Sequence, residues 1–222
     1  ARSEPQPVIT LTDGPLELYG EPKDDPRYQE GFNQYLDALE ETASMNVVTA
    51  GYVDKPRADL IVRLLELSLL SPENLAQAGR ERPLFGVTDN QLFEERLQPG
   101  ERTAVFAIQS SSAERFKQRS SGLALHFFYL NVGRVGRPWL ARVEVPAWVS
   151  RQPEMVDLLQ FTLLRQCAQL GGRAYPYALH RAHEVALVTF QEKGQLAGLI
   201  EAELRRQGVF IGQKSDKSVI KG

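Results

Sequence analysis

Two apolar runs separated by a turn constrain the fold of this 222-residue chain most strongly. Residues 45–53 are mostly apolar and rich in valine, which is typical of a buried strand. Asp54-Lys55-Pro56-Arg57 ends this strand, and residues 60–70 are nearly all apolar over a length typical of a buried helix. A strand, a turn and a helix in succession indicate a parallel strand pair within an α/β fold.

The rest of the chain continues this alternation of strands and helices. Residues 8–12 are predicted to form a strand, and Asp25 before Pro26 marks a helix start, because proline is favoured at the first helical position. We also predict strands at residues 103–108, 123–130 and 139–145 and a helix from Pro153, whereas residues 109–122 are a polar segment without an assigned element. The expected fold is a mixed α/β sheet of five or six strands flanked by helices.

Bulk composition limits the kinds of partner and compartment. The chain has 26 Lys and Arg against 28 Asp and Glu, so any nucleic-acid surface has to be a local basic patch. The single cysteine, Cys167, excludes an internal disulfide and is typical of a reducing cytoplasm, and its apolar helical context predicts a buried thiol. There is no run of about 18 apolar residues, so we expect no membrane-spanning helix.

A carboxylate follows the first predicted strand. Asp13-Gly14-Pro15 is a good turn sequence, which is one interpretation. The other is functional, because α/β folds place site residues at the ends of buried strands. The sequence alone leaves both interpretations open.

An imidazole lies on the apolar face of a helix predicted from about residue 178. Leu179, His183 and Ala186 share that face by their spacing, so His183 is expected to point inward. An inward histidine needs a polar partner or a metal, and a hydrogen-bonded core residue is the plainer alternative. Tyr175 lies in the loop before this helix and is expected to reach the same place.

Basic residues occur in three places suited to phosphate contacts. Lys55 and Arg57 follow the buried strand, where the alternative is a solvated turn. The segment 131–138 carries two glycines and two arginines between predicted strands, which suits both a phosphate-contacting tip and an ordinary hairpin. The third place is the polar segment 109–122, which holds Arg115, Lys117 and Arg119. Together with Arg134 and Arg137 of the segment 131–138, these three residues are the main candidates for DNA binding.

Five short sequence blocks occur in order along the chain. The last block has the pattern Tyr-Pro-x-x-Leu-x-x-Ala-His, here from Tyr175 to His183, at a helix start near the C-terminus. The other four are Thr12-Asp13-Gly14-Pro15-Leu16, Ala50-Gly51-Tyr52-Val53-Asp54-Lys55-Pro56-Arg57, Asp89-Asn90-Gln91-Leu92-Phe93 and Arg142-Val143-Glu144-Val145-Pro146. Each block alone is weak, but in this order the five together resemble the NurA family of DNA-repair nucleases. The resemblance covers roughly residues 8–207 of the chain.

The resemblance implies a fold, a chemistry and partners. NurA-like proteins have an RNase H-like core, cut DNA with Mn²⁺ or Mg²⁺, and resect DNA double-strand breaks beside a HerA-type hexameric ATPase, which implies a homodimeric, Mn-dependent deoxyribonuclease (an exo- or endonuclease). The resemblance places Asp13 and His183 at the metal and Tyr175 beside it. Carboxylate oxygens suit both ions, and Mn²⁺ also accepts imidazole, so these residue types fit that chemistry.

The sequence also departs from the family pattern. The family's Asp-Gly-Ser strand and the glutamate on the helix after it should precede Asp13, and this sequence lacks them. We therefore expect residues 1–222 alone to cleave DNA weakly or not at all, and a segment upstream of Ala1 to carry the missing ligands; Asp54, Asp89 and Glu144 are the internal substitutes to test. The alternative is a non-catalytic DNA-binding or adaptor module. We predict a linker at residues 1–7, the nuclease domain at 8–207 and a flexible tail at 208–222.

Overall fold

The computed structural model describes residues 7–18, 25–71, 73–74, 79, 82–171, 174–186 and 190–207. The chain divides into two compact units, Ala1–His180 and Arg181–Gly222, and each is described by itself. Residues 1–6 of the predicted linker and the whole predicted tail lie outside the described residues. Among the described residues, no helix is long and apolar enough to cross a membrane.

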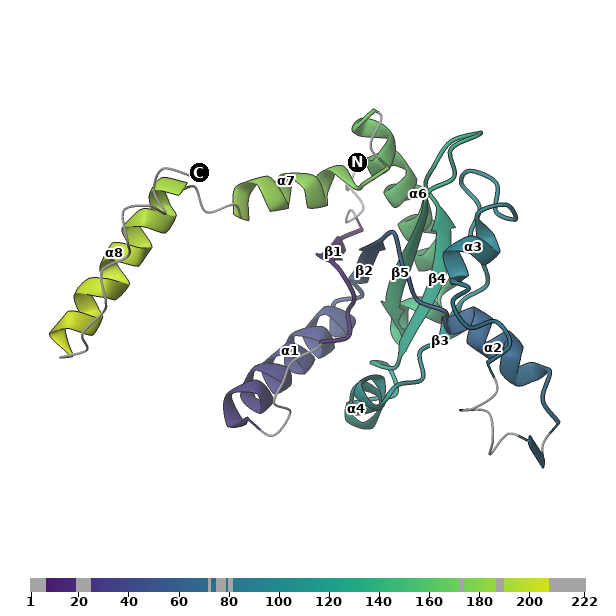
Figure 1. Cartoon of the computed structure of the whole chain (residues 1–222), viewed down its shortest axis with the longest axis horizontal. Coiled ribbons are helices and arrows are strands. Elements are labelled where there is room, and N and C mark those ends of the chain that lie inside the picture. Colours follow the sequence, from purple (N-terminus) through teal and green to yellow (C-terminus); the bar gives the residue numbers. More distant parts are fainter. Residues whose placement is uncertain are drawn as a thin grey trace, which may run out of the picture. The chain divides into compact units, whose positions relative to one another are not determined.

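The first unit is built on a five-stranded sheet in the order β1-β2-β5-β4-β3 (Figure 1). The strands are β1 (Ile9–Asp13), β2 (Val48–Asp54), β3 (Phe106–Ala107), β4 (Leu125–Asn131) and β5 (Leu140–Pro146). β1 runs parallel to β2, and the other neighbours are antiparallel. The predicted mixed sheet is confirmed, although the strand expected at 103–108 is reduced to the two residues of β3.

The parallel pair is made by a different connection from the one expected. The helix between β1 and β2 is α1 (Pro26–Ser44), which begins as predicted: the Asp25 side chain accepts a hydrogen bond from the Arg27 amide. The helix after β2 is α2 (Leu60–Ser68), but the other edge of β2 pairs with β5 in the antiparallel direction. The crossover therefore precedes β2 along the chain.

One face of the sheet packs against α6 (Pro153–Gln169), which follows the short helix α5 (Ala147–Ser150). Leu159, Leu163 and Cys167 point from α6 into the main buried cluster, together with strand residues such as Ala50 and Val143. Cys167 is therefore a buried thiol, as predicted, and burial raises its pKa to about 11.

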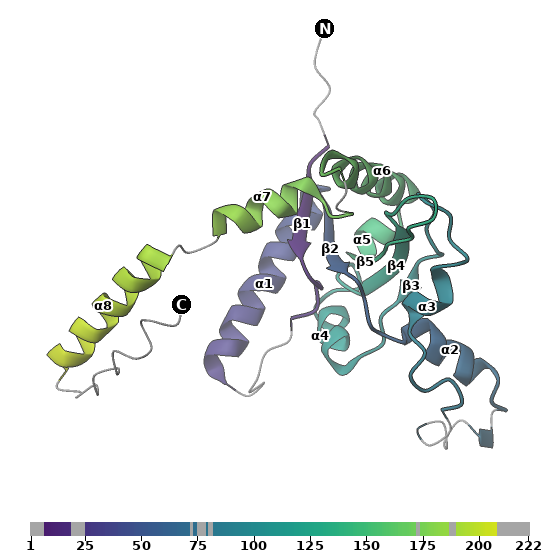
Figure 2. The same ribbon diagram turned by 45° about the horizontal axis from the view of Figure 1, so that its top comes forward.

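The polar segment 109–122, to which the sequence assigns no element, contains a helix. Residues 111–119 form a helix, α4 (Ser111–Arg119), because the Ser110 side chain caps its start and Phe116 is fully buried. The Phe116 ring lies 5.3 Å from that of Phe32 on α1, in an edge-to-face contact worth about 1 kcal/mol beyond its buried area. Figure 2 shows α4 and α1 as separate helices beside the sheet.

One buried carboxylate, that of Asp89, has a structural role. α3 (Asp89–Phe93) starts with a capping box between Thr88 and Gln91. The Asp89 carboxylate is fully buried and accepts hydrogen bonds from the amides of Ile61 and Val62 at the start of α2, and from the Tyr129 hydroxyl at 2.6 Å. Asp89 therefore caps α2.

Two helices complete the described chain. α7 (Tyr177–Ala186) starts one residue before the predicted position and crosses the boundary between the units, and α8 (Phe190–Arg206) follows it. Leu179 is buried in the main cluster, as its spacing predicts. His183 and Ala186 are exposed, so the inward orientation expected for His183 is wrong.

Candidate active site at the carboxyl ends of β1 and β2

Two aspartates lie at the same edge of the sheet. Asp13 is the last residue of β1 and Asp54 the last residue of β2. Because the strands are parallel and Asp13 pairs with Tyr52, Asp13, Tyr52 and Asp54 lie on one face of the sheet. Both carboxylates are exposed, at a place where α/β folds bind ligands.

Tyr175 lies at this edge, as the sequence predicts. Its hydroxyl lies beside the Asp13 carboxylate, close enough for the two groups to affect each other's charge state. Burial, hydrogen bonding to Asp13 and the negative charges of Asp13 and Asp54 raise the pKa of Tyr175 well above its ordinary value. Tyr175 is therefore a neutral hydroxyl at physiological pH and is placed to donate to Asp13.

Tyr52 holds the loop that carries Tyr175. Its ring meets the Tyr175 ring edge-on at 5.7 Å, and its hydroxyl donates to the Ala174 carbonyl at 3.3 Å. Tyr52 is fully buried beside Cys167, so the loop is attached to the core of the sheet. Sequence reasoning missed this role, although Tyr52 belongs to one of the blocks that resemble the family.

A close backbone crossing positions Asp13. Gly14, at φ +115°, donates its amide to the Tyr52 carbonyl at 2.9 Å, so the chain turns back over β2 directly after Asp13. A Cβ at Gly51 would lie 2.6 Å from the Gly14 carbonyl oxygen and 2.8 Å from the Leu16 nitrogen. Glycine at position 51 is thus required for this approach.

Gly51→Ala is expected to destabilise the protein by about 1–3 kcal/mol, the usual cost of forcing extra atoms into a packed region. Both clashing atoms belong to the backbone, which cannot rotate away. Urea denaturation of the variant tests this. Gly31→Ala is the matched control, because Gly31 lies in α1 with open space around its Cβ position, and alanine there should stabilise the helix by about 0.5–1 kcal/mol. Equal stability of the Gly51 variant and the wild type would contradict the crossing.

Glu144 supports the same turn from the opposite face. Its carboxylate accepts a hydrogen bond from the Leu16 amide at 2.9 Å and pairs with Arg142 at 2.8 Å. Glu144 is 1% exposed, and this burial raises its pKa even though Arg142 and the Leu16 amide oppose the shift. Since Asp13 and Glu144 face opposite sides of the sheet, Glu144 orders the turn and does not share a site with Asp13.

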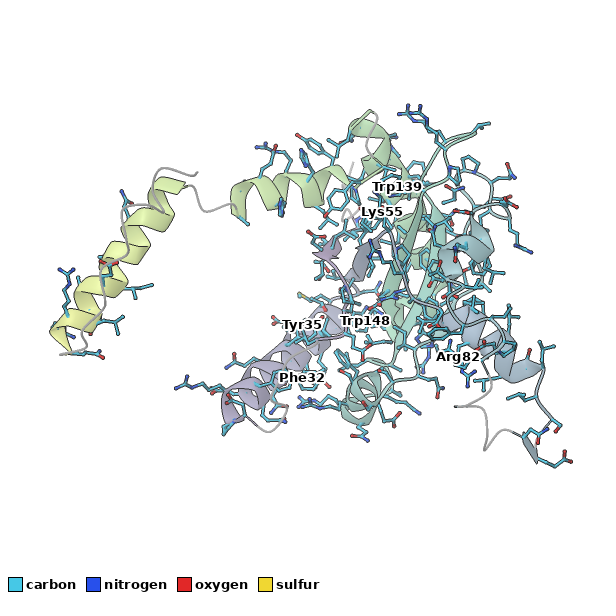
Figure 3. The ribbon with its side chains drawn as sticks, in the orientation of Figure 1. Phe32, Tyr35, Lys55, Arg82, Trp139 and Trp148 are labelled. Carbon is cyan, nitrogen blue, oxygen red and sulfur yellow. The ribbon has the colours of Figure 1, made fainter. Side chains whose placement is uncertain are left out.

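Asp54 is the remaining internal substitute, and it already has a partner. Its carboxylate accepts a hydrogen bond from the Trp139 indole at 2.7 Å. The Lys55 ammonium lies 4.1 Å from the centre of the same indole, and Lys55 has a left-handed backbone at φ 47° (Figure 3). Trp139 was not singled out from the sequence, because nothing local links it to a residue 85 positions away.

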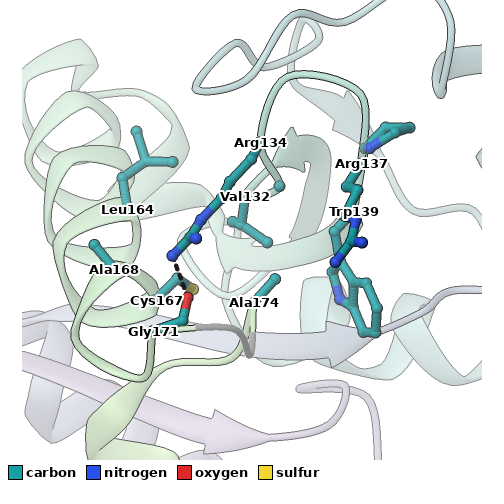
Figure 4. Close-up of a pocket in the computed structure, with 11 residues that line it drawn as sticks. Val132, Arg134, Arg137, Trp139, Leu164, Cys167, Ala168, Gly171 and Ala174 are labelled. Atoms are coloured by element: carbon teal, nitrogen blue, oxygen red, sulfur yellow. Dashed lines mark hydrogen bonds between the residues drawn. The ribbon is translucent and has the colours of Figure 1, made fainter.

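Residues 131–138 form the expected hairpin between β4 and β5. Arg134 and Arg137 pair across its tip through two backbone hydrogen bonds of 3.1 and 2.9 Å, with Gly136 at φ +73° in the turn. Both arginines line a cavity of about 600 Å³ between the hairpin and the end of α6, together with Trp139 (Figure 4). The Arg134 guanidinium also donates to the Gly171 carbonyl there.

A second cavity of about 350 Å³ is lined by Lys55, Arg57 and Trp139. Because β2 and β5 are antiparallel, with Asp54 opposite Ala141, the hairpin tip and the end of β2 lie at the same edge of the sheet. The structure thus brings four of the predicted DNA-binding residues, Lys55, Arg57, Arg134 and Arg137, to the edge that holds Asp13.

The three basic residues of α4 lie elsewhere and have protein partners. Arg119 pairs with Asp37 and Glu40, both at 2.8 Å, and the Arg115 guanidinium stacks 3.9 Å above the Phe32 ring. Lys117 lies 3.7 Å from Glu114. Their role in DNA binding stays a prediction.

The residue types at this edge suit a hard cation, but their number is small. Asp13 and Asp54 offer carboxylate oxygens of the kind that Mg²⁺ and Mn²⁺ accept. In the described part of the chain, however, no group of three or more His, Cys, Asp or Glu side chains is placed to hold a metal ion. His183 belongs to the second unit, so its predicted approach to Asp13 stays a prediction.

The fold and this edge define a class. A mixed five-stranded sheet flanked by helices, with aspartates at the ends of its parallel strands, is consistent with an RNase H-like α/β domain. The model of the NurA domain matches residues 1–188, and the chain therefore belongs to the NurA family, a family of nucleases associated with DNA repair. No curated protein and no solved structure matches the chain significantly.

Proposed function

We propose that this protein is a metal-dependent DNA nuclease domain of NurA type, with Asp13 and Tyr175 at its active site. The observation that carries the proposal is the meeting of Asp13, Tyr175 and Asp54 at one edge of the sheet, beside two cavities lined by basic residues. The family match supports a nuclease role in general. His183, Mn²⁺ or Mg²⁺, a homodimeric assembly and a HerA-type ATPase partner in end resection are the further parts of this proposal.

Each group at this edge has a task in phosphodiester cleavage. Asp13 would contribute a carboxylate ligand, and the ion would supply an activated water and stabilise the leaving oxygen. Tyr175 orients the Asp13 carboxylate through its hydrogen bond, as outer partners of metal ligands commonly do. Arg134, Arg137, Lys55 and Arg57 are placed to bind the backbone phosphates, which positions the strand without reading its sequence.

The proposal is tested by incubating the purified protein with end-labelled single- and double-stranded DNA and Mn²⁺ or Mg²⁺. We expect weak cleavage by residues 1–222, because the described residues hold no complete set of metal ligands. The second candidate, a non-catalytic DNA-binding module, rests on that same incomplete set, and a form that binds DNA but neither binds Mn²⁺ nor cleaves would establish it.

Charge reversal at Arg134 and Arg137 together should weaken binding to DNA regardless of its base sequence. Each phosphate contact releases about one counterion, so losing two contacts should flatten the slope of log affinity against log salt by about 2. The measurement is a fluorescence-anisotropy titration at several salt concentrations.

The matched control for this experiment is Arg165→Glu with Arg205→Glu, which makes the same change in net charge at exposed positions of α6 and α8. We expect it to alter affinity much less than reversal at the hairpin. An unchanged salt slope in the hairpin variant would show that residues 131–138 are only a structural connection.

A further inference from the structure

Trp139 lines both cavities at the edge of the sheet that holds Asp13 and Asp54. It lines the larger cavity with Arg134 and Arg137, and the smaller one with Lys55 and Arg57. The ring is half-buried, so part of its surface is accessible. An accessible indole surrounded by cationic side chains is the combination that binds bases of single-stranded nucleic acid.

The indole is held in one orientation. The Asp54 carboxylate accepts its N–H at 2.7 Å, and the Lys55 ammonium lies 4.1 Å from the ring centre. The backbones on the two sides of the hairpin also approach closely beside Trp139, because a Cβ at Gly133 would lie 2.4 Å from the Arg137 carbonyl oxygen and 2.5 Å from the Trp139 nitrogen. A ring ordered in advance loses little entropy when a flat ligand stacks on it.

The two arginines of the hairpin both line the larger cavity, and Arg134 reaches the Gly171 carbonyl after α6 (Figure 4). Residues paired directly across a hairpin project to the same face, and like charges in such a pair repel each other. A phosphate bound by both would offset that repulsion. One guanidinium has five N–H donors, so the bond from Arg134 to Gly171 is compatible with a phosphate contact.

We propose that the larger cavity binds one nucleotide of single-stranded DNA, with the base stacked on Trp139 and its phosphate held by Arg134 and Arg137. The cavity volume of about 600 Å³ is in the usual range of small-ligand sites. A base paired within a duplex keeps its faces stacked on its neighbours, so the indole reaches only an unpaired base. This inference rests on the proposed nuclease function, to which it adds a preference for single strands.

The test uses the fluorescence of the two tryptophans, Trp139 and Trp148. The Trp148 indole donates to the Val47 carbonyl at 3.0 Å and packs against the cores on both sides, so it serves as the internal control. A short oligothymidylate is added in the presence of a metal chelator, which prevents cleavage. We expect it to quench the wild type and Trp148→Phe, but not Trp139→Phe.

Affinity measurements complete the test. Trp139→Ala should bind the oligonucleotide about tenfold more weakly, the usual loss for one stacked base, whereas its affinity for blunt duplex should change less than about twofold. Trp139→Phe keeps a stacking ring and should bind within about threefold of the wild type. Thermal melting of each variant verifies that it is folded.

Several results would overturn the inference. These are equal quenching of Trp139→Phe and the wild type, unchanged affinity of Trp139→Ala for single strands, or an equal loss for single strands and duplex. Quenching by thymidine monophosphate that equals quenching by the oligonucleotide at the same nucleotide concentration would assign the cavity to free nucleotides instead. Because no cleavage is measured, quenching at Trp139 in a protein that never cleaves DNA would refute the proposed nuclease activity and leave the single-strand site standing.

Discussion

Replacing Asp13 or His183 by alanine is expected to lower metal-dependent DNA cleavage by more than about 100-fold. Removing an outer partner of a metal ligand commonly costs about 10- to 100-fold, and removing a ligand should cost more. The loss removes both affinity for the ion and the geometry that aligns water with phosphorus. Tyr175→Phe removes only the hydroxyl that interacts with Asp13. We expect it to lower metal-dependent cleavage by about 10- to 100-fold.

The assay is the initial rate of degradation of end-labelled DNA with Mn²⁺. Two controls match the substitutions in chemistry. Glu154→Ala removes an exposed carboxylate from the first turn of α6, and His180→Ala removes the other imidazole of α7. Both should retain cleavage within a few-fold.

Other outcomes would change the assignment of individual residues. Cleavage that survives Asp13→Ala and His183→Ala together would overturn the assignment of both residues. If His183→Ala and His180→Ala behave alike, the imidazole of the family motif has no special role, and the exposed position of His183 is its ordinary surface state. Loss of cleavage in Asp54→Ala with an intact fold would add Asp54 to the ligands.

Structural features that depend on a few consecutive residues could be predicted from the sequence. β1 and β2, the start of α1 at Asp25-Pro26, the capping box at Thr88 and the hairpin after Asn131 depend on local signals, and the structure has all of them. α4 was missed because its two serines and five charged or amide side chains hide the burial of Phe116, which depends on α1. A polar segment becomes a helix here because a tertiary contact outweighs its propensity.

The candidate site could be predicted only in part. Asp13 was identified as a candidate from a turn sequence and Tyr175 from a motif, and the structure places the two residues next to each other. The Asp54–Trp139 bond depends on the register of β2 and β5, which no single stretch of sequence specifies. The face of His183 was misjudged for a related reason: helical spacing predicts which residues share a face, but only packing decides how far along the helix that face is buried, and here it ends after Leu179.

Raising the pH from 10 to 12 is expected to unfold the first unit, because several of its tyrosines are held neutral in the folded state. Burial is the main cause: it raises the pKa of Tyr35 to about 12, and those of Tyr52 and Tyr129 above that. In the unfolded chain tyrosine titrates near 10. Above that pH the unfolded state therefore binds fewer protons than the folded state, so the free energy of unfolding falls as pH rises.

The magnitude decides whether the effect is visible. Each neutral buried tyrosine lowers the free energy of unfolding by about 1.4 kcal/mol per pH unit within its window. Tyr52 and Tyr129 are fully buried and together remove about 3 kcal/mol per unit, a large part of a typical total stability of about 5–15 kcal/mol. Tyr175 is only half-buried and adds less.

The measurement is urea denaturation followed by circular dichroism at pH 8, 9, 10, 11 and 11.5. Tyr52→Phe should make the decline above pH 10 shallower by about 1.4 kcal/mol per unit, although the variant is less stable at pH 8 because it loses the bond to the Ala174 carbonyl. Tyr177→Phe is the matched control, because Tyr177 is 41% exposed and its removal should leave the slope unchanged. A free energy of unfolding that stays constant from pH 8 to 11.5 would show that Tyr52 and Tyr129 ionise freely in the folded protein, and the attachment of the Tyr175 loop through Tyr52 would then have to be abandoned.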